Sequence, residues 1–292
     1  MSITGMIFKA SCKRSDDKRD AGLSTPADIV RYDDIVYGPN RRWNVLDVYR
    51  PRGAGGKLPV IVSVHGGGWV YGDKERYQYY CMSLAQQGFA VVNFTYGLAP
   101  RFKFPSQLED TNRVFSFVLE QAERYGFDTG HVFGVGDSAG AHLLALFCCL
   151  CTNPDYAVQY PFRAPAGFAP TAVALNCGVY EIKIESNRDP SARLMADLLP
   201  DRGTDEELRR ISPLNHLTDR FPPAFVMTAE GDFLAKAAPP MAAKLESLGV
   251  PVVYKYYGDR DHVLGHVFHC DMRSEFAAQC NRDECDYFRG FC

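Results

Sequence analysis

The strongest constraint on the fold of this chain is the alternation of two kinds of segment along it. Short apolar runs rich in β-branched residues, typical of strands buried on both faces, are separated by segments with apolar residues at helical spacing. The expected strands lie at 31–38, 43–51, 59–69, 89–97, 131–136, 170–180, 222–232 and 251–259. The expected helices lie at 74–88, 107–126, 139–151, 241–249 and 273–291. This alternation predicts an α/β protein with a mostly parallel central sheet and helices on both faces.

The length and segment order predict a single domain. Chains of 292 residues are within the range that α/β folds build around one large core, so we expect one domain over residues 1–292. Residues 1–30 hold a dense charge run and no strand signal, and we interpret them as an N-terminal extension. Residues 181–218 also lack a strand signal. Bare loops of that length are rare, so we expect a helical lid insertion there.

The net charge and the cysteine content indicate which binding partners and which cellular compartment to expect. A net charge of −3 gives no electrostatic reason to expect nucleic acid or an anionic membrane, so a small molecule is the favoured partner. The first twenty residues have too few apolar positions for a signal-peptide core or a membrane span. The ten cysteines are diluted through a chain large enough to build its own core, which favours reduced thiols in a cytoplasmic protein. The oligomeric state stays open.

A serine stands at the junction of an expected strand and an expected helix. The stretch "VFGVGDSAGAHLLALF" places Ser138 in a GxSxG pattern, directly after the strand 131–136. In this context the pattern is typical of a nucleophile held on a sharp turn, where side chains at the two glycines would collide with neighbouring elements. His142, one helical turn later, is expected to pack in the core.

A run of three glycines follows an earlier buried strand. In "HGGGW", residues 65–69, backbone amides can approach a bound oxygen without interference from side chains. We expect the amides of Gly67, Gly68 and Ala139 to form an oxyanion hole, and His65 to brace the loop. A phosphate-binding loop is the alternative, but the lysine and Ser/Thr that such a loop needs are missing.

A serine nucleophile needs a base and an acid that orients the base. The loop after the last expected strand supplies His262, His266 and His269, which is where the chain order serine, acid, histidine puts the base. For the acid, Asp232 follows the preceding strand directly. Glu230 still lies within or at the end of that strand.

Taken together, "HGGGW", "YGLAPRFKFP", "GDSAG", "GDFL" and "HVF" resemble the α/β-hydrolase fold esterases of the hormone-sensitive-lipase type and the related carboxylesterase and feruloyl-esterase-like proteins. In that family the acid lies in a D-x-L pattern, matched by Asp232, and the base in H-x-F, matched by His266. The resemblance therefore favours His266 over His262. The chain departs from the family at Val267, where glycine is usual, and at Gly97, where arginine usually precedes "LAP".

The resemblance implies acyl transfer by Ser138, Asp232 and His266 on carboxylic esters, through an acyl-enzyme and with no metal or cofactor. The aromatic residues that follow the pocket-forming strands are candidates for substrate binding and favour small acyl groups. They are Trp69, Tyr71, Phe102 and Phe104. The same triad could cleave amides, formamides or peptides. A non-catalytic ligand-binding protein on the same fold is the remaining alternative.

Overall fold

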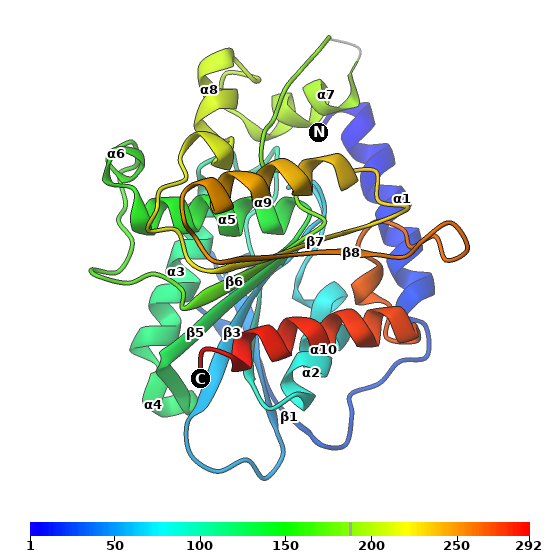
Figure 1. Ribbon diagram of the computed structural model, residues 1–292, viewed down its shortest axis with the longest axis vertical. Helices are drawn as coiled ribbons and strands as arrows, with labels where there is room; N and C mark the ends of the chain where they lie inside the picture. Colours follow the sequence, from blue (N-terminus) through cyan, green and yellow to red (C-terminus); the bar gives the residue numbers. More distant parts are fainter. Residues whose placement is uncertain (187–188) are drawn as a thin grey trace.

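A computed structural model, which describes residues 1–186 and 189–292, has one eight-stranded sheet at its centre (Figure 1). The order across the sheet is β1-β2-β4-β3-β5-β6-β7-β8. The strands are β1 (Ile29–Val36), β2 (Val45–Pro51), β3 (Leu58–Val64), β4 (Ala90–Thr95), β5 (Phe127–Asp137), β6 (Ala172–Asn176), β7 (Ala224–Ala229) and β8 (Val252–Tyr257). This confirms the α/β class and the position of each expected strand.

Helices cover both faces of the sheet. The α-helices are α1 (Ile3–Asp20), α2 (Lys74–Gln86), α3 (Ser106–Glu120), α4 (Ala122–Tyr125), α5 (Ala139–Thr152), α6 (Pro154–Ala157), α7 (Pro190–Leu198), α8 (Asp205–Arg210), α9 (Ala238–Ser247) and α10 (Glu275–Arg289). Three short 3₁₀ turns are η1 (Pro213–Asn215), η2 (Ala235–Ala237) and η3 (Phe268–Cys270). Figure 1 shows α2 and α10 on one side of the sheet and α5 and α9 on the other.

Strand direction determines where side chains can meet. β2 is antiparallel to both β1 and β4, whereas β4, β3, β5, β6, β7 and β8 all run parallel to their neighbours. The carboxyl ends of the parallel strands therefore share one edge of the sheet, which is where ligands bind in this architecture. The residues that follow β3, β5, β6, β7 and β8 are brought together at that edge.

Two apolar cores hold the layers together. The larger lies between the sheet and the side of α3, α5 and α9, where Phe115 stacks on Phe147 with ring centroids 4.3 Å apart. The smaller lies on the side of α2 and α10, where Phe133 of the sheet stacks on Phe288 at 4.6 Å. Burial of both sheet faces explains why the strands read as continuous apolar runs in the sequence.

The two segments without strand signals lie near each other. The insertion 181–218 holds α7, α8 and η1, except that residues 187 and 188 are outside the described part. The expected N-terminal extension is an ordered helix, α1, over most of its length, and the sequence analysis did not predict it. Ser2 caps α1 and donates its hydroxyl to Asp197 of α7 at 2.7 Å, so the extension is attached to the insertion (Figure 1).

Two further observations concern membrane-spanning helices and the state of the cysteines. In the described part of the chain, no helix combines the length and the apolar character needed to cross a bilayer. The ten cysteines all lie in that part, and each is a free thiol.

Candidate active site

Ser138 occupies a strained turn between β5 and α5. Its φ of 51° and ψ of −119° are unfavourable for any residue with a side chain, and such strain is typical of functional positions. The flanking glycines are required by packing. A Cβ at Gly140 would lie 1.9 Å from the carbonyl oxygen of Val64, and one at Gly136 would lie 2.7 Å from the backbone of Gly140. The turn thus holds the serine at the carboxyl edge of the sheet, at the start of α5.

Residues 65–69 after β3, here called the glycine loop, lie at the same carboxyl edge of the sheet as Ser138. Gly67 has a φ of +106°, and a Cβ there would lie 2.3 Å from the carbonyl oxygen of Tyr71. Gly68 has a φ of +57°, and a Cβ there would lie 2.9 Å from the Phe8 ring. Only glycine fits either position without strain. Both glycines, like Ser138 and Ala139, line cavities at the carboxyl edge of the sheet.

Hydrogen bonds fix this loop to the nucleophile turn. The Gly66 amide donates to the Tyr77 hydroxyl at 3.0 Å, and that hydroxyl donates to Asp137 Oδ2 at 2.8 Å. We call this chain the Gly66–Tyr77–Asp137 clamp. Burial raises the pKa of Asp137, the residue before Ser138, to about 6, although the bond from Tyr77 opposes the shift. The clamp therefore joins the glycine loop to the buried carboxyl group of Asp137, beside Ser138.

His65 also supports the loop. Its Nδ1 donates to the Gly66 carbonyl at 2.8 Å, and its ring stacks on Tyr96 with centroids 4.0 Å apart. Burial lowers the pKa of His65 to about 4, so the ring is neutral near pH 7. This geometry supports a bracing role.

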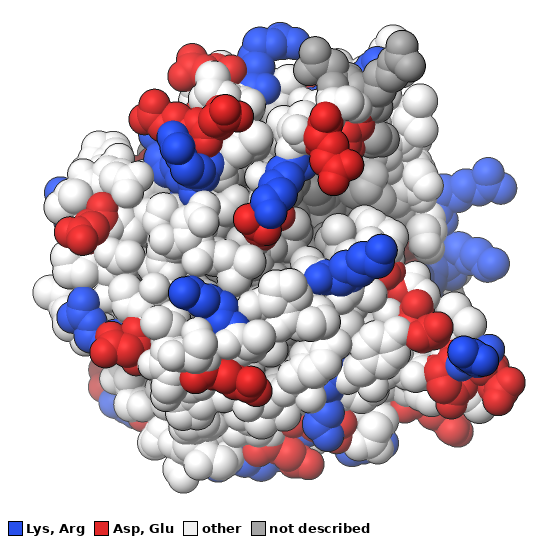
Figure 2. All heavy atoms as spheres, turned by 45° about the horizontal axis from the view of Figure 1, so that its top comes forward, with Lys and Arg blue, Asp and Glu red and all other residues white. Residues whose placement is uncertain are grey.

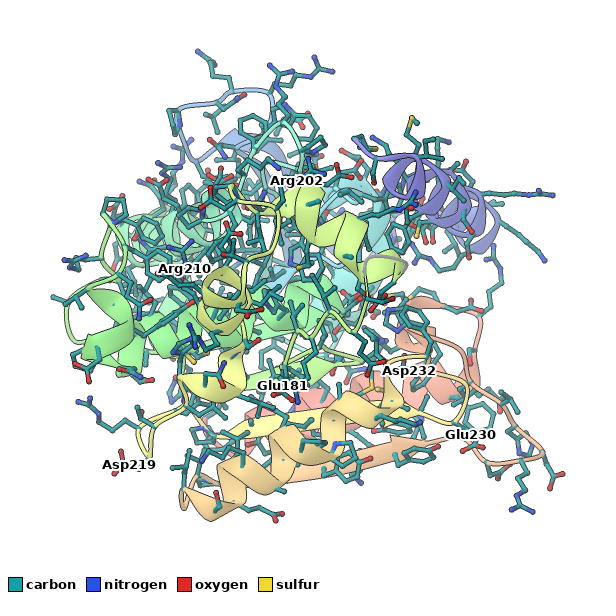
Figure 3. All side chains as sticks on the ribbon, turned by 90° about the horizontal axis from the view of Figure 1, so that it is seen from above. Glu181, Arg202, Arg210, Asp219, Glu230 and Asp232 are labelled. Atoms are coloured by element: carbon teal, nitrogen blue, oxygen red, sulfur yellow. The ribbon has the colours of Figure 1, made fainter. Side chains whose placement is uncertain are left out.

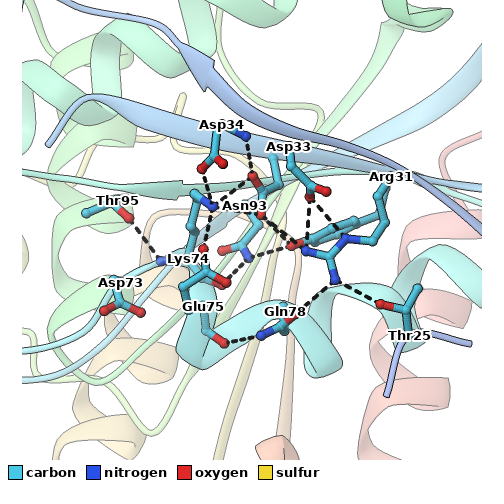
Figure 4. Close-up of polar contacts among 12 residues, drawn as sticks. Thr25, Arg31, Asp33, Asp34, Asp73, Lys74, Glu75, Gln78, Asn93 and Thr95 are labelled. Carbon is cyan, nitrogen blue, oxygen red and sulfur yellow. Dashed lines mark hydrogen bonds and ion pairs between the residues drawn. The ribbon is translucent and has the colours of Figure 1, made fainter. Parts of the chain in front are cut away.

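The far end of the loop is anchored to the sheet (Figure 4). Lys74, the first residue of α2, donates its amide to Thr95 Oγ1 at 3.0 Å and accepts at its carbonyl from Asn93 at 2.7 Å. Its ammonium group forms ion pairs with Asp47 at 3.0 Å and Asp34 at 2.9 Å. Because these partners lie on β1, β2 and β4, the loop between β3 and α2 is held at both ends.

The acid and the base are paired. His266 Nδ1 lies 2.7 Å from Asp232 Oδ1, and the same oxygen accepts from the Leu234 amide at 2.9 Å. Asp232 Oδ2 accepts from Thr228 Oγ1 at 2.8 Å. Burial opposes ionisation of Asp232, but the bond and charge of His266 together with the other donors lower its pKa overall. Ser138 and His266 line one cavity of about 290 Å³, and Asp232 is linked to that cavity through its bond to His266.

The other carboxylates and histidines of these loops have different partners. Glu230, two residues before Asp232, accepts from the Tyr256 hydroxyl, and Figure 3 shows it further out than Asp232. His262 is exposed and pairs with Asp259 of its own loop at 3.1 Å. His269 is buried, and burial lowers its pKa to about 3. The geometry brings together Asp232 and His266 and leaves the alternatives outside.

The remaining histidine near the nucleophile is structural. His142 is buried, accepts from Trp69 Nε1 at 3.3 Å and lies 2.6 Å from the Ile211 carbonyl through its Nε2. It therefore links α5 to the glycine loop and to the insertion, in line with the expected packing role.

Two cavities open from Ser138. The smaller, about 130 Å³, is mainly apolar and is lined by Phe8, Gly68, Trp69, Ser138, Ala139, Val179, Ile182, Ser191, Leu194, Met195, Phe233 and Leu234. The larger, about 290 Å³, carries hydroxyl and charged groups and is lined by Phe8, Ser11, Cys12, Ser15, Asp16, Arg19, Gly67, Tyr71, Tyr77, Asp137, Ser138, Phe233, His266 and Val267. The two cavities lined by Ser138 thus offer apolar surroundings on one side and polar surroundings on the other.

The four aromatic candidates for substrate binding separate into two pairs. Trp69 lines the apolar cavity and Tyr71 the polar one. Phe102 packs on Trp43, and Phe104 is 1% exposed and packs on Tyr160. Neither phenylalanine lines the two cavities: Phe104 lies in the core, and Phe102 is half-buried beside Trp43.

Similarity of the chain to known proteins agrees with this geometry. Residues 46–239, about two thirds of the chain, match the sequence profile named BD-FAE. The chain belongs to the BD-FAE family. The likeness to hormone-sensitive-lipase-type esterases stated from the motifs is thereby confirmed.

Named relatives of this BD-FAE family member include esterases. Esterase LipQ of Mycobacterium tuberculosis is 30% identical over 268 residues, which cover 85% of this chain and 62% of LipQ. Carboxylic ester hydrolase LipN of the same organism is 28% identical, covering 75% of this chain and 60% of LipN. The chain thus spans about 60% of the length of these curated relatives.

Solved structures share the fold. Esterase B from Lactobacillus rhamnosis, inhibited by a C4-C4 tributyrin phosphonate, superposes with a TM-score of 0.88 at 24% identity, covering 99% of this chain and 95% of that one. An esterase from Pyrobaculum calidifontis gives a TM-score of 0.79 at 23% identity, covering 99% and 93%. These likenesses establish the α/β-hydrolase fold for the BD-FAE family member described here.

The sequence analysis missed the contribution of α1 to the site. Phe8 lines both cavities, while Asp16 accepts from the Tyr71 hydroxyl at 2.8 Å and Arg19 donates to the Arg76 carbonyl at 2.6 Å. The contacts of Asp16 and Arg19 join residues more than 50 positions apart, so no local sequence pattern could predict them. Periodicity gave no signal either, since Gly5 is the one fully buried residue of α1.

Proposed function

We propose that the protein is a serine hydrolase that cleaves carboxylic esters of small acyl groups through an acyl-enzyme. The observation that carries this proposal is that Ser138 and His266 line the same cavity while His266 is paired with Asp232. The esterase names of the relatives support it.

In the first half-reaction, His266 Nε2 accepts the proton of the Ser138 hydroxyl while its oxygen attacks the ester carbonyl. Asp232 holds the ring through Nδ1 and stabilises the imidazolium that forms. The carbonyl oxygen becomes an anion, which the amides of Gly67, Gly68 and Ala139 bind. Collapse of this intermediate expels the alcohol, which leaves with the proton from His266.

In the second half-reaction, water attacks the acyl group on Ser138. His266 takes a proton from the water and returns one to Ser138 as the carboxylic acid departs. These steps use side chains and amides of this chain throughout.

The two cavities assign the halves of the substrate. The apolar cavity, at about 130 Å³, is less than half the volume of the polar one, which suits a short acyl chain. The polar cavity, with Asp16, Arg19 and Tyr71, suits an alcohol with hydrogen-bonding groups. Figure 2 shows acidic and basic side chains interspersed on the face above the site, so no single-sign field there favours a highly charged partner such as nucleic acid or an anionic membrane.

We also place the protein in the cytoplasm. Ten free thiols, eight of them buried or nearly so in a core that needs no disulfide, suit a reducing compartment.

The test is hydrolysis of p-nitrophenyl acetate, butyrate and laurate by the purified protein and by Ser138→Ala. We expect acetate or butyrate to be the best substrate, and the variant to lose on the order of 10³-fold or more in kcat. Ser83→Ala, on α2 outside both cavities, is the matched control. A Ser138→Ala protein that keeps most of the activity would refute the mechanism, and equal rates on a p-nitroanilide amide would favour an amidase.

A further inference from the structure

Cys177 occupies a strained position beside the acid and the base. It directly follows β6, has a φ of 47° and is 1% exposed. Its amide donates to the Met227 carbonyl at 2.8 Å, which holds the residue in this left-handed conformation. A non-glycine residue kept in such a conformation within a catalytic centre calls for an explanation in terms of what its side chain does.

The Cys177 thiol faces the Asp232–His266 pair. Its sulfur, a carboxylate oxygen of Asp232 and a ring nitrogen of His266 all lie within 4.8 Å of one another. The thiol donates to Met227 Sδ at 3.9 Å and also interacts with the Asp232 carboxylate and the Val267 amide. Burial together with the Asp232 charge raises the pKa of the thiol well above the usual range. In the free enzyme the group is therefore a neutral thiol and no rival nucleophile.

We propose that Cys177, Asp232 and His266 form a binding site for a thiophilic divalent cation, Zn²⁺ above all, and that the bound cation inhibits the enzyme. The inhibition, though not the binding, rests on the esterase function proposed above. The hydroxyl of Ser138 takes no part in the site.

The ligand set matches zinc chemistry. Zn²⁺ binds sulfur at about 2.3 Å and nitrogen or oxygen at about 2.0–2.1 Å in a tetrahedron, which places the donors roughly 3.3–3.6 Å apart. The three donors therefore need shifts of about 1 Å to enclose the ion. A thiolate and a carboxylate together balance its charge, whereas Mg²⁺ and Ca²⁺ prefer all-oxygen sites. Of the three ligands, His266 lines the polar cavity, so an ion would approach the site from that side.

Binding changes the protonation of the site in a defined way. The Cys177 thiol loses one proton to solvent when the zinc–sulfur bond forms. Zinc replaces the proton on His266 Nδ1, and the neutral ring carries its proton on Nε2 instead. That nitrogen can then no longer accept the Ser138 proton, so acyl transfer stops.

The binding test uses Ser138→Ala, which keeps all three ligands and has no acyl-transfer activity to interfere. Titration calorimetry with ZnCl₂ in chelator-free buffers of different ionisation enthalpy should give one equivalent bound and about one proton released. Co²⁺ should produce a thiolate-to-cobalt charge-transfer band. Adding Cys177→Ala should remove both signals. Cys270→Ala is the matched control, because Cys270 is a buried cysteine 3.6 Å from His269 but belongs to no cluster of three ligands; this variant should bind as before.

The inhibition test compares ester hydrolysis with and without ZnCl₂, each variant being measured against its own zinc-free rate. We expect the half-inhibitory concentration to rise at least tenfold in Cys177→Ala and in Cys177→Ser, and to stay the same in Cys270→Ala. Circular dichroism verifies that each variant is folded.

Failure to bind zinc in Ser138→Ala, or equal binding after loss of the Cys177 thiol, would overturn the site. Zinc binding with undiminished hydrolysis would overturn the inhibition. A protein that binds zinc through Cys177 but cleaves no ester would refute the proposed function and leave the metal site standing.

Discussion

Removal of one hydroxyl, in Tyr77→Phe, tests whether the Gly66–Tyr77–Asp137 clamp positions the glycine loop. The substitution leaves the ring in the core and deletes the bond from the Gly66 amide at 3.0 Å and the bond to Asp137 at 2.8 Å. The oxyanion donors themselves remain, but the loop loses its link to the nucleophile turn.

The expected losses follow from these two bonds. Complete removal of one oxyanion donor costs about 100- to 1000-fold in kcat, so displacement of an intact loop should cost about 10- to 100-fold, or about 1.4–2.7 kcal/mol of barrier. KM should change little, because neither bond contacts the ester. The free energy of unfolding should fall by about 2–3 kcal/mol, since one of the bonds serves a buried carboxyl group.

The pH profile separates a positioning effect from simple destabilisation. The Tyr77 bond lowers the pKa of Asp137, which burial raises to about 6, so its loss moves that pKa higher. The charges of His266 and Arg19 lower the pKa of Asp137, and the charge of Asp137 in turn raises the pKa of the groups around it. These are Tyr77, Cys81, Tyr96, Cys177, Cys270 and Glu284. Ionised Asp137 favours the imidazolium that forms on His266 during attack, so protonation slows the reaction. The acid limb of kcat should therefore shift to higher pH in Tyr77→Phe.

The assay is kcat and KM on p-nitrophenyl acetate from pH 5 to 9, with urea denaturation alongside. Tyr79→Phe, which removes a bond to the Leu23 carbonyl from the same helix outside the catalytic cavities, is the control and should leave the profile unmoved. A Tyr77→Phe enzyme within twofold of the parent kcat and with an unshifted acid limb would refute the positioning argument.

Three further outcomes are expected. Asp232→Asn should lower kcat by roughly 10³- to 10⁴-fold through loss of the His266 orientation, whereas Glu230→Gln should not, and steady-state rates decide between them. Burial raises the pKa of Glu284 to about 7, so its contribution to stability is complete below about pH 4 and is lost as the pH rises through 7. In urea denaturation at pH 8, Glu284→Gln should therefore be up to about 3 kcal/mol more stable than the parent, whereas the exposed Glu246→Gln should gain nothing. Equal stability of Glu284→Gln and the parent at pH 8 would contradict this. Val267→Gly relieves a φ of 54° and should stabilise the protein by about 1 kcal/mol in urea, and a loss of stability would show that the valine side chain outweighs the strain.

Sequence patterns predicted the sheet and the order of its chemistry because both depend on local signals. Strands buried on both faces must be apolar throughout, so their positions could be found without knowledge of their neighbours. Glycines at 67, 136 and 140 are imposed by close backbone approach and Gly68 by its positive φ and the Phe8 ring, and the glycines themselves are visible in the sequence. The pairing of Asp232 with His266 remained a hypothesis until the structure brought the two loops together.

The contacts between distant residues that complete the site could not be predicted from local sequence signals. Asp137, the last residue of β5, directly precedes Ser138 in the motif, yet its partner Tyr77 lies 60 residues earlier on α2. Phe102 and Phe104 follow a strand as pocket residues do, but Phe104 lies in the core and Phe102 packs beside Trp43. Tertiary packing decides such directions, and a local pattern cannot encode them.

Backbone strain gathers where the strands end. In the part of the chain that the structure describes, six non-glycine residues have positive φ, and four of them surround the site: Trp69, Ser138, Cys177 and Val267. Ser138 and Cys177 directly follow β5 and β6, whereas Trp69 and Val267 lie within the loops after β3 and β8. At roughly 1–3 kcal/mol each, such strain persists only where the surrounding packing over-determines it. The two buried cores on either side of the sheet provide that packing, which is why a rigid sheet can keep these strained residues in place near its carboxyl edge.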